Sequence, residues 1–200
     1  MSRNTIFRLF EAVIPEPVCD LIVEEGKQLN AQQASVREQD GTDVVRQDAR
    51  KTQVAFWQAN HWVNGLLEHH IKMANRELWN YHLTITQGVQ FGIYGPGDNY
   101  DWHKDEFDKP FDENSAPAWQ GQARKVSAVL NLSDADSYTG GNLKFKNFYG
   151  QEVGGPEFDK RMRRKGSLIV FPAYVFHTVV PVETGERCSL ASWMLGEPFK

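Results

Sequence analysis

Two residues near the middle of the chain could hold a metal ion. His103 and Asp105 flank a single lysine in the sequence His-Lys-Asp. If this segment is a β-strand, side chains two positions apart point to the same face, so an imidazole and a carboxylate project side by side. Ligands of this kind make up half of a transition-metal site. The pair could equally lie in an exposed turn, because the surrounding segment 98–108 is acidic.

A second histidine, His177, lies far downstream in an apolar segment whose alternation is typical of a buried strand. A buried imidazole needs a polar partner, which a backbone carbonyl could supply as well as a metal ion. Together with His103 and Asp105 it would complete a set of two histidines and one carboxylate, which favours non-haem Fe(II). Such a triad leaves coordination positions open, and a 2-oxo acid can fill two of them.

A cation and a hydroxyl group follow on one strand face. Arg187 lies ten residues after His177, and Ser189 shares its face by the same two-residue period, with Cys188 on the opposite face. A buried arginine needs an anion, and a ligand carboxylate would match its guanidinium. Near the triad, Arg187 would be the cation for the far carboxylate of a 2-oxo acid. The alternative is a surface arginine paired with Glu186 in the preceding turn.

Helices near the start and strands thereafter must position these residues. One helix is expected from Pro17, and a second, capped by Asn60, runs to about Trp79 on apolar residues at helical spacing. Expected strands cover residues 52–57, 83–93, 126–132, 143–145, 167–171, 175–180 and 187–193. The sequence therefore predicts a mainly β (α+β) fold, a sandwich or barrel with helices packed on one side.

The segment 106–123 is predicted to be a long functional loop, because it lacks periodicity and is rich in aromatic and acidic residues. It is a candidate lid over a substrate. Trp102, Phe107, Phe111 and Trp119 flank the first metal-ligand pair, and such aromatic rings suit a proline ring or an extended peptide. The same rings could instead pack the loop onto the barrel.

Length and composition limit the remaining choices. The 200 residues fit one domain, with residues 1–80 as helical support and 81–200 as the catalytic core. A net charge of −4 argues against a nucleic-acid partner, and the basic run 160–165 is predicted to be a solvated loop, with a contact patch as the alternative. No apolar run is long enough to span a membrane. The two cysteines are expected to be reduced thiols of a cytoplasmic protein.

With these motifs in this order, the sequence resembles the 2-oxoglutarate- and Fe(II)-dependent dioxygenases, in particular their prolyl 4-hydroxylase-like branch. The resemblance extends over nearly the whole chain, including residues 10–22 and 50–57. The matching motifs are Tyr94-Gly95-Pro96-Gly97 with Tyr100, His103-x-Asp105, segment 124–132, Gly140-Gly141-x-Leu143-x-Phe145, segment 165–171, His177-x-Val179-x-Pro181-Val182 and Gly185-x-Arg187-x-Ser189.

The resemblance implies a double-stranded β-helix (a cupin-like jelly roll) with iron at one open end. It implies that His103, Asp105 and His177 are catalytic iron ligands. It also implies that the 2-oxoglutarate co-substrate is bound by the three remaining site residues, Arg187, Ser189 and Tyr94. Dioxygen would be the second co-substrate, with ascorbate as an additional reductant in some members. Collagen-type enzymes carry lysine where this chain has Arg187; both bind a carboxylate, but the collagen-type substrate does not transfer directly.

The reaction implied is hydroxylation of a C–H bond with release of succinate and CO2, and the expected substrate is a prolyl residue of a protein or peptide. One alternative is a hydroxylase of a free amino acid or other small molecule. Another is a non-catalytic jelly-roll binding module. A metallo-hydrolase or sugar-binding cupin is a third, although such sites usually lack the Arg-x-Ser pair.

Overall fold

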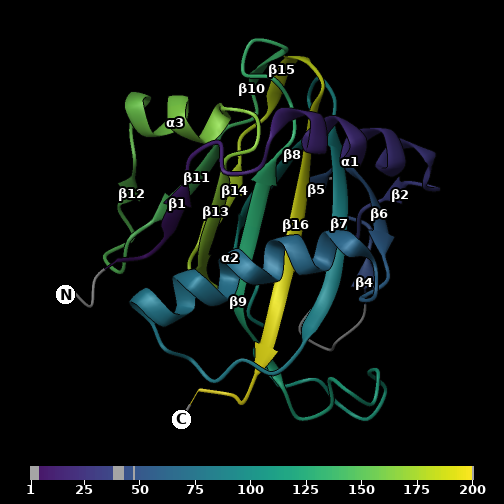
Figure 1. The fold of residues 1–200 in the computed structure, drawn as a ribbon, viewed down its shortest axis with the longest axis vertical. Helices are drawn as coiled ribbons and strands as arrows, with labels where there is room; N and C mark the ends of the chain where they lie inside the picture. Colours follow the sequence, from purple (N-terminus) through teal and green to yellow (C-terminus); the bar gives the residue numbers. More distant parts are fainter. Residues whose placement is uncertain (1–4, 38–42, 47, 200) are drawn as a thin grey trace.

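Two antiparallel sheets lie face to face in the computed structural model, and helices cover one of them (Figure 1). The structure describes residues 5–37, 43–46 and 48–199. Within these ranges the chain forms three helices, α1 (Glu16–Gln28), α2 (Trp62–Leu78) and α3 (Pro156–Arg163). The mainly β fold with N-terminal helices packed on one side is therefore confirmed.

The larger sheet has seven strands and the smaller one five. The larger sheet has the order β1 (Arg8–Phe10), β13 (Leu168–Pro172), β9 (Ala123–Asn131), β16 (Arg187–Gly196), β7 (Thr86–Tyr94), β6 (Gln53–Trp57) and β2 (Gln32–Gln33). The smaller has the order β12 (Glu152–Val153), β11 (Leu143–Lys146), β14 (His177–Val179), β8 (Asn99–His103) and β5 (Arg50–Lys51). Two short ribbons pair β10 (Tyr138–Gly140) with β15 (Val182–Gly185) and β3 (Val36–Arg37) with β4 (Asp43–Val44).

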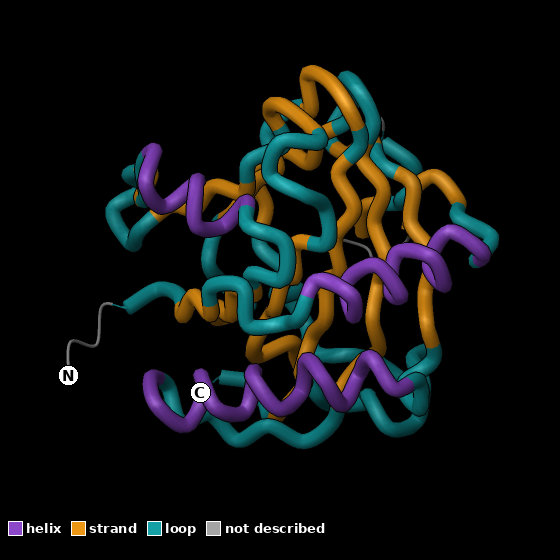
Figure 2. Tube along the Cα trace, turned by 45° about the horizontal axis from the view of Figure 1, so that its top comes forward, coloured by secondary structure: helices purple, strands orange, loops and turns teal. Residues whose placement is uncertain are grey.

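Helices α1 and α2 run across the outer face of the larger sheet, in front of β9, β16 and β7 (Figures 1 and 2). Strand alternation explains why this face is apolar. In β13, Leu168 and Val170 point to the helices, whereas Ile169 and Phe171 point to the smaller sheet. Two apolar cores result, and burial of each such side chain contributes roughly 1.5–3 kcal/mol. The rigid inner face between the sheets is where a site can be built.

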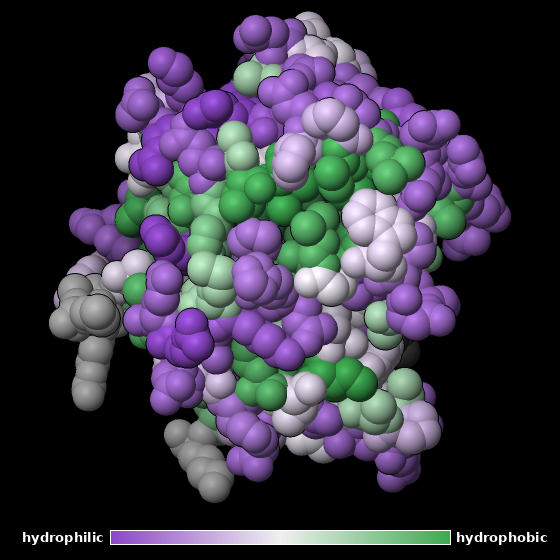
Figure 3. Space-filling model, in the orientation of Figure 1, coloured by the Kyte–Doolittle hydropathy of each residue, from purple (hydrophilic) through white to green (hydrophobic). Residues whose placement is uncertain are grey.

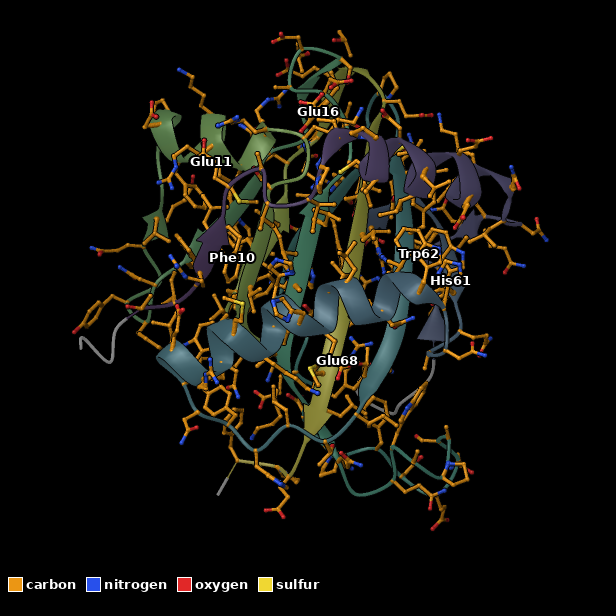
Figure 4. All side chains as sticks on the ribbon, viewed as in Figure 1. Phe10, Glu11, Glu16, His61, Trp62 and Glu68 are labelled. Carbon is orange, nitrogen blue, oxygen red and sulfur yellow. The ribbon has the colours of Figure 1, made fainter. Side chains whose placement is uncertain are left out.

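The two predicted N-terminal helices are confirmed, but the predicted details of their first turns are wrong. Pro17 is the second helical residue, because α1 begins at Glu16. Asn60 does not cap α2, which begins at Trp62 without a side-chain cap. Instead, Glu25 of α1 holds this end of α2: its carboxylate accepts a 3.2 Å hydrogen bond from the Trp62 indole. Figure 4 shows Trp62 at the end of α2 next to α1.

The basic run at residues 160–165 is not the solvated loop that its composition predicts. Most of it forms the last turns of α3, and its cations have specific partners. Arg161 and Arg164 both reach the carboxylate of Glu11 at 2.7 Å; Glu11 lies beside α3 in Figure 4. Arg163 donates to backbone carbonyls of the β10 region, including Gly140 O at 2.8 Å. The run therefore fastens α3 to the N-terminal segment and to one ribbon.

Hydrophobic residues gather in a band near α1 and α2 on the face shown in Figure 3, with hydrophilic residues around them. Leu21 of α1 and Trp62 of α2 are exposed apolar side chains of these helices. Among the residues that the structure describes, no helix combines the length and the apolar character needed to cross a membrane.

Replacing Gly166 by alanine is expected to destabilise this fold strongly. Gly166 has φ +80°, and a Cβ atom there would lie 2.0 Å from the carbonyl oxygen of Ile14. We expect the free energy of unfolding to fall by about 2–4 kcal/mol, because the left-handed conformation is strained for alanine and the new methyl group clashes with backbone. Urea denaturation measures the change.

The matched control is Gly65→Ala, because Gly65 lies in α2 with nothing within 4 Å of its added Cβ. This change should leave stability unaltered or raise it by about 0.5–1 kcal/mol. Equal unfolding midpoints for the Gly166→Ala variant and the unaltered protein would show that the Ile14–Gly166 contact is not needed for stability.

Candidate metal centre and adjoining cavity

Neighbouring strands of the smaller sheet bring the two histidines together. His103 is the last residue of β8, and His177 is the first residue of β14; the two are direct partners in the antiparallel register. Their ring centroids lie 4.1 Å apart. Residues separated by more than 70 positions in the sequence thus share one spot on the inner face of the sheet.

Backbone carbonyls fix the orientation of both imidazoles. His103 Nδ1 lies 2.7 Å from Asp101 O, and His177 Nδ1 lies 2.9 Å from Val175 O. A carbonyl oxygen only accepts, so each Nδ1 carries the hydrogen and donates it. Each Nε2 then has a free lone pair directed away from its strand. This is the arrangement that orients histidine ligands in metal sites.

Asp105 does meet the histidines, but the strand-based reason for its placement is wrong. β8 ends at His103, and Asp105 lies in the bend that follows. Its backbone N–H donates to Ala173 O at 2.9 Å, which ties the bend to the end of β13. The carboxylate oxygens then lie 3.9 Å from His103 Nε2 and 3.6 Å from His177 Nε2.

The three side chains fit a single transition-metal ion. Their ligand atoms all lie within 4.8 Å of one another, and no other such group of three occurs in the described ranges. Metal–nitrogen and metal–oxygen bonds of about 2.1 Å allow one ion to join atoms up to about 4.2 Å apart, as both Asp105–histidine pairs are. Two histidines and one carboxylate on one side of an ion form the facial set typical of non-haem Fe(II).

The protonation states of His103 and Asp105 suit metal binding. Burial lowers the pKa of His103 to about 3, and the neighbouring His177 adds to the effect, so the ring is neutral near pH 7. Burial alone would raise the pKa of Asp105, but His177, His103 and Arg124 outweigh it and lower the pKa to about 2. The site therefore presents a neutral imidazole and an ionised carboxylate, the forms that ligate metals.

A cavity of 520 Å³ adjoins the three side chains, and Arg187, Ser189 and Tyr94 also line it. Arg187 and Tyr94 are register partners on β16 and β7. Arg187 is only 3% exposed and donates to Ser189 Oγ at 3.2 Å. The alternative of a surface arginine paired with Glu186 is thus wrong; Glu186 pairs with Lys27 instead.

Gly92 lies next to two of the residues that line the cavity. It is the register partner of Ser189. A Cβ atom at Gly92 would lie 3.4 Å from the Tyr94 ring and 3.7 Å from Ser189 Oγ, which is ordinary van der Waals contact. As predicted, Cys188 points the other way, into the core beneath the helices.

The loop 106–123 borders the cavity. Phe107, Phe111 and Trp119 line it, and their rings contact one another. The loop closes on itself through a backbone hydrogen bond from Phe111 to Gln122 O at 2.8 Å. Trp102 is not among the lining residues; its ring lies 4.2 Å from the ammonium group of Lys146. Whether the loop moves over a substrate stays a prediction.

Two further arginines line the cavity, and the pattern of metal ligands in the sequence does not indicate either. Arg124 lies between the rings of Phe107 and Trp193 and donates to Gln87 Oε1 at 2.7 Å. Arg50 lies over the Tyr100 ring, which itself stacks on His103. Both arginines begin segments that belong to the family resemblance, 50–57 and 124–132, but the sequence does not show that their side chains reach this cavity.

Comparisons with known proteins agree with this geometry. The pattern of the 2OG-Fe(II) oxygenase superfamily matches residues 89–195. A PKHD-type hydroxylase of Klebsiella pneumoniae is 33% identical over 104 residues, which are 52% of this chain and 41% of the relative. The chain thus matches less than half the length of that relative.

Two solved structures are similar over most of both chains. A Pseudomonas putida prolyl-4-hydroxylase has a TM-score of 0.70 and 22% identity, covering 95% of this chain and 93% of that one. A prolyl hydroxylase from Trichoplax adhaerens, in complex with a hypoxia inducible factor peptide fragment, has a TM-score of 0.68 and 15% identity over 94% and 82%. At these identities the likeness shows a shared fold, which confirms the double-stranded β-helix.

Proposed function

Because this chain belongs to the 2OG-Fe(II) oxygenase superfamily, we propose that it is an Fe(II)- and 2-oxoglutarate-dependent dioxygenase. In this proposal His103, Asp105 and His177 hold the iron. The observation that carries it is the meeting of these three side chains, with both Nδ1 atoms bound to carbonyls, at the wall of a cavity that also holds a buried arginine.

The bound Fe(II) would supply activation of dioxygen, coupled to oxidative decarboxylation of 2-oxoglutarate. In the net reaction one oxygen atom of O2 enters the substrate as a hydroxyl group, and the other enters succinate as CO2 leaves. Arg187 binds the distal carboxylate of 2-oxoglutarate through its guanidinium fork, with Ser189 beside it. Tyr94, opposite Arg187 in the register, closes the other wall of that subsite.

The proposed substrate is a prolyl residue of a protein or peptide, and the proposed location of the reaction is the cytoplasm. Phe107, Phe111 and Trp119 are the aromatic residues of the cavity mouth that can pack on a proline ring. Trp102 lies outside this cavity and is left out of the substrate site. The peptide fragment in the complex of the Trichoplax adhaerens prolyl hydroxylase supports this substrate class.

Product analysis tests the function. The protein is titrated with Fe(II) and 2-oxoglutarate without oxygen, and a visible absorption band is expected when both are bound. Dioxygen is then added with a panel of proline-containing peptides and free amino acids. We expect succinate and a product heavier by one oxygen atom. A mass gain on free amino acids alone would mean that the substrate is a small molecule and not a peptide. Binding of Fe(II) and 2-oxoglutarate without succinate formation would mean that the protein is a non-catalytic binding module.

A further inference from the structure

Arg50 is a buried cation with no acidic partner among the residues that the structure describes. The residue is 8% exposed. The guanidinium donates to Ser35 O at 3.3 Å and to Gln90 Oε1 at 3.1 Å, both neutral acceptors, and its Nε has no acceptor in the described part of the chain. Within the part of the chain that the structure describes, no carboxylate lies within ion-pair distance of it. A buried charge of this kind is costly unless an anion arrives to pair with it.

The guanidinium lies at the junction of two cavities. Arg50 and Gln90 line the 520 Å³ cavity of the metal centre and also a neighbouring cavity of 290 Å³ over β6. Arg50 is the register partner of Tyr100, and its Cζ lies 4.4 Å from the centre of that ring. The Tyr100 ring in turn stacks on His103 at 3.5 Å. A group bound to Arg50 is therefore separated from a metal ligand by a single aromatic ring.

We infer that Arg50 and Gln90 bind a carboxylate of the substrate and thereby place the rest of it at the metal centre. This inference rests on the proposed function. One guanidinium balances one carboxylate, whereas a phosphate dianion would keep a net charge. The planar fork also matches a planar carboxylate. Gln90 accepts from Arg50 through Oε1, which leaves its amide N–H groups to donate to the same anion.

The carboxylate at Arg50 is distinct from that of 2-oxoglutarate. Arg187 is on β16 of the larger sheet and is bonded to Ser189, whereas Arg50 is on β5 at the edge of the smaller sheet. Arg50 and Arg187 thus form separate cationic subsites of the cavity. The substrate class that follows is a prolyl compound with its own carboxylate near the ring, from a free amino acid, a peptide C-terminus or an acidic side chain.

Matched acid and amide probes test this inference and identify the source of the carboxylate. The pairs are L-proline and L-prolinamide, acetyl-glycyl-proline and its C-terminal amide, and acetyl-aspartyl-prolinamide and acetyl-asparaginyl-prolinamide. Calorimetry measures their binding to protein loaded with Fe(II) and 2-oxoglutarate without oxygen. In at least one pair we expect the acid to bind about tenfold or more tightly than the amide. That pair identifies whether the carboxylate comes from a free amino acid, a peptide C-terminus or an acidic side chain.

Two neutral variants, Arg50→Met and Arg50→Gln, should reduce the preference for the acid to less than about twofold, with 2-oxoglutarate affinity unchanged. The glutamine variant keeps polar contacts should methionine disturb the fold. Arg8→Gln removes an equal charge at a surface pair with Glu77 and should keep the preference.

Equal binding of acid and amide in all three pairs, or a preference that survives both Arg50 variants, would overturn the inference. So would a loss of 2-oxoglutarate affinity in those variants. Product analysis separates this from the proposed function: hydroxylation of the amides as fast as the acids refutes only the carboxylate subsite, whereas acid-selective binding without any hydroxylated product refutes only the function.

Discussion

Replacing Asp105 by alanine is expected to weaken Fe(II) binding by more than about 100-fold, since loss of even an outer-shell partner costs about 10–100-fold. Turnover of 2-oxoglutarate should fall below detection. Asp105 is the only anionic ligand of the proposed set, and it lies within 4 Å of both Nε2 atoms. Without it, two histidines face a divalent cation in a buried site that has no anionic ligand. Iron titration and succinate formation measure the two effects.

The control for this variant is Asp108→Ala, three residues along the same segment. Asp108 is exposed, pairs with Lys104 on the surface and does not line the cavity. Its loss changes the net charge equally and should leave both iron affinity and turnover unchanged. Succinate formation at the full rate by the Asp105→Ala variant would contradict the ligand assignment, and equal losses in both variants would indicate a general effect of charge.

The metal ligands could be predicted from residue types, but their geometry could not. A His-x-Asp pair and a histidine in an apolar strand can be recognised in the sequence. The bend that carries Asp105 cannot, because it depends on a hydrogen bond to Ala173, a residue nearly 70 positions away. His103 and Asp105 do lie together, but not as alternate residues of one strand, since β8 ends at His103, before Asp105.

Arg187 and Ser189 are better determined by the sequence, because strand alternation alone fixes which face each occupies. β16 is a long central strand, so Arg187 faces the cavity and Cys188 faces the helices, as expected. The structures of the basic run in α3 and of the first turn of α2 could not be predicted from local sequence. Their conformations depend on distant partners, Glu11 for α3 and Glu25 for α2, which local sequence does not contain.

The position of the Arg50 side chain could not be predicted from the sequence. Its segment belongs to the family resemblance, but a two-residue edge strand does not fix a side-chain direction from pattern. Only the pairing of β5 with β8 places Arg50 over Tyr100 and beside the metal centre. The residues that would contact the substrate come from chain segments that only the tertiary structure brings together. Residue types therefore predict the chemistry of the site but not its substrate specificity.

Replacing Arg187 by methionine is expected to raise the KM for 2-oxoglutarate by at least about 30-fold, because loss of a buried hydrogen-bonded charge costs about 2–5 kcal/mol. Arg187 is nearly fully buried, and its only hydrogen-bond partner among the described residues is the hydroxyl of Ser189. The guanidinium is therefore available to a ligand carboxylate. Initial rates across 2-oxoglutarate concentrations measure the change.

The Arg187→Lys variant separates the effect of losing the charge from the effect of losing the two parallel N–H donors of the guanidinium. Lysine keeps the cation but has no planar pair of donors, so we expect it to recover part of the affinity. Iron binding should stay normal in both variants, because no metal ligand is altered and Arg187 lies on the other sheet from β8 and β14.

Arg161→Met, which breaks a surface pair with Glu11, is the matched control for loss of charge. A wild-type KM in the Arg187→Met variant would mean that another cation of the cavity holds the co-substrate, and Arg50 and Arg124 would be the residues to test.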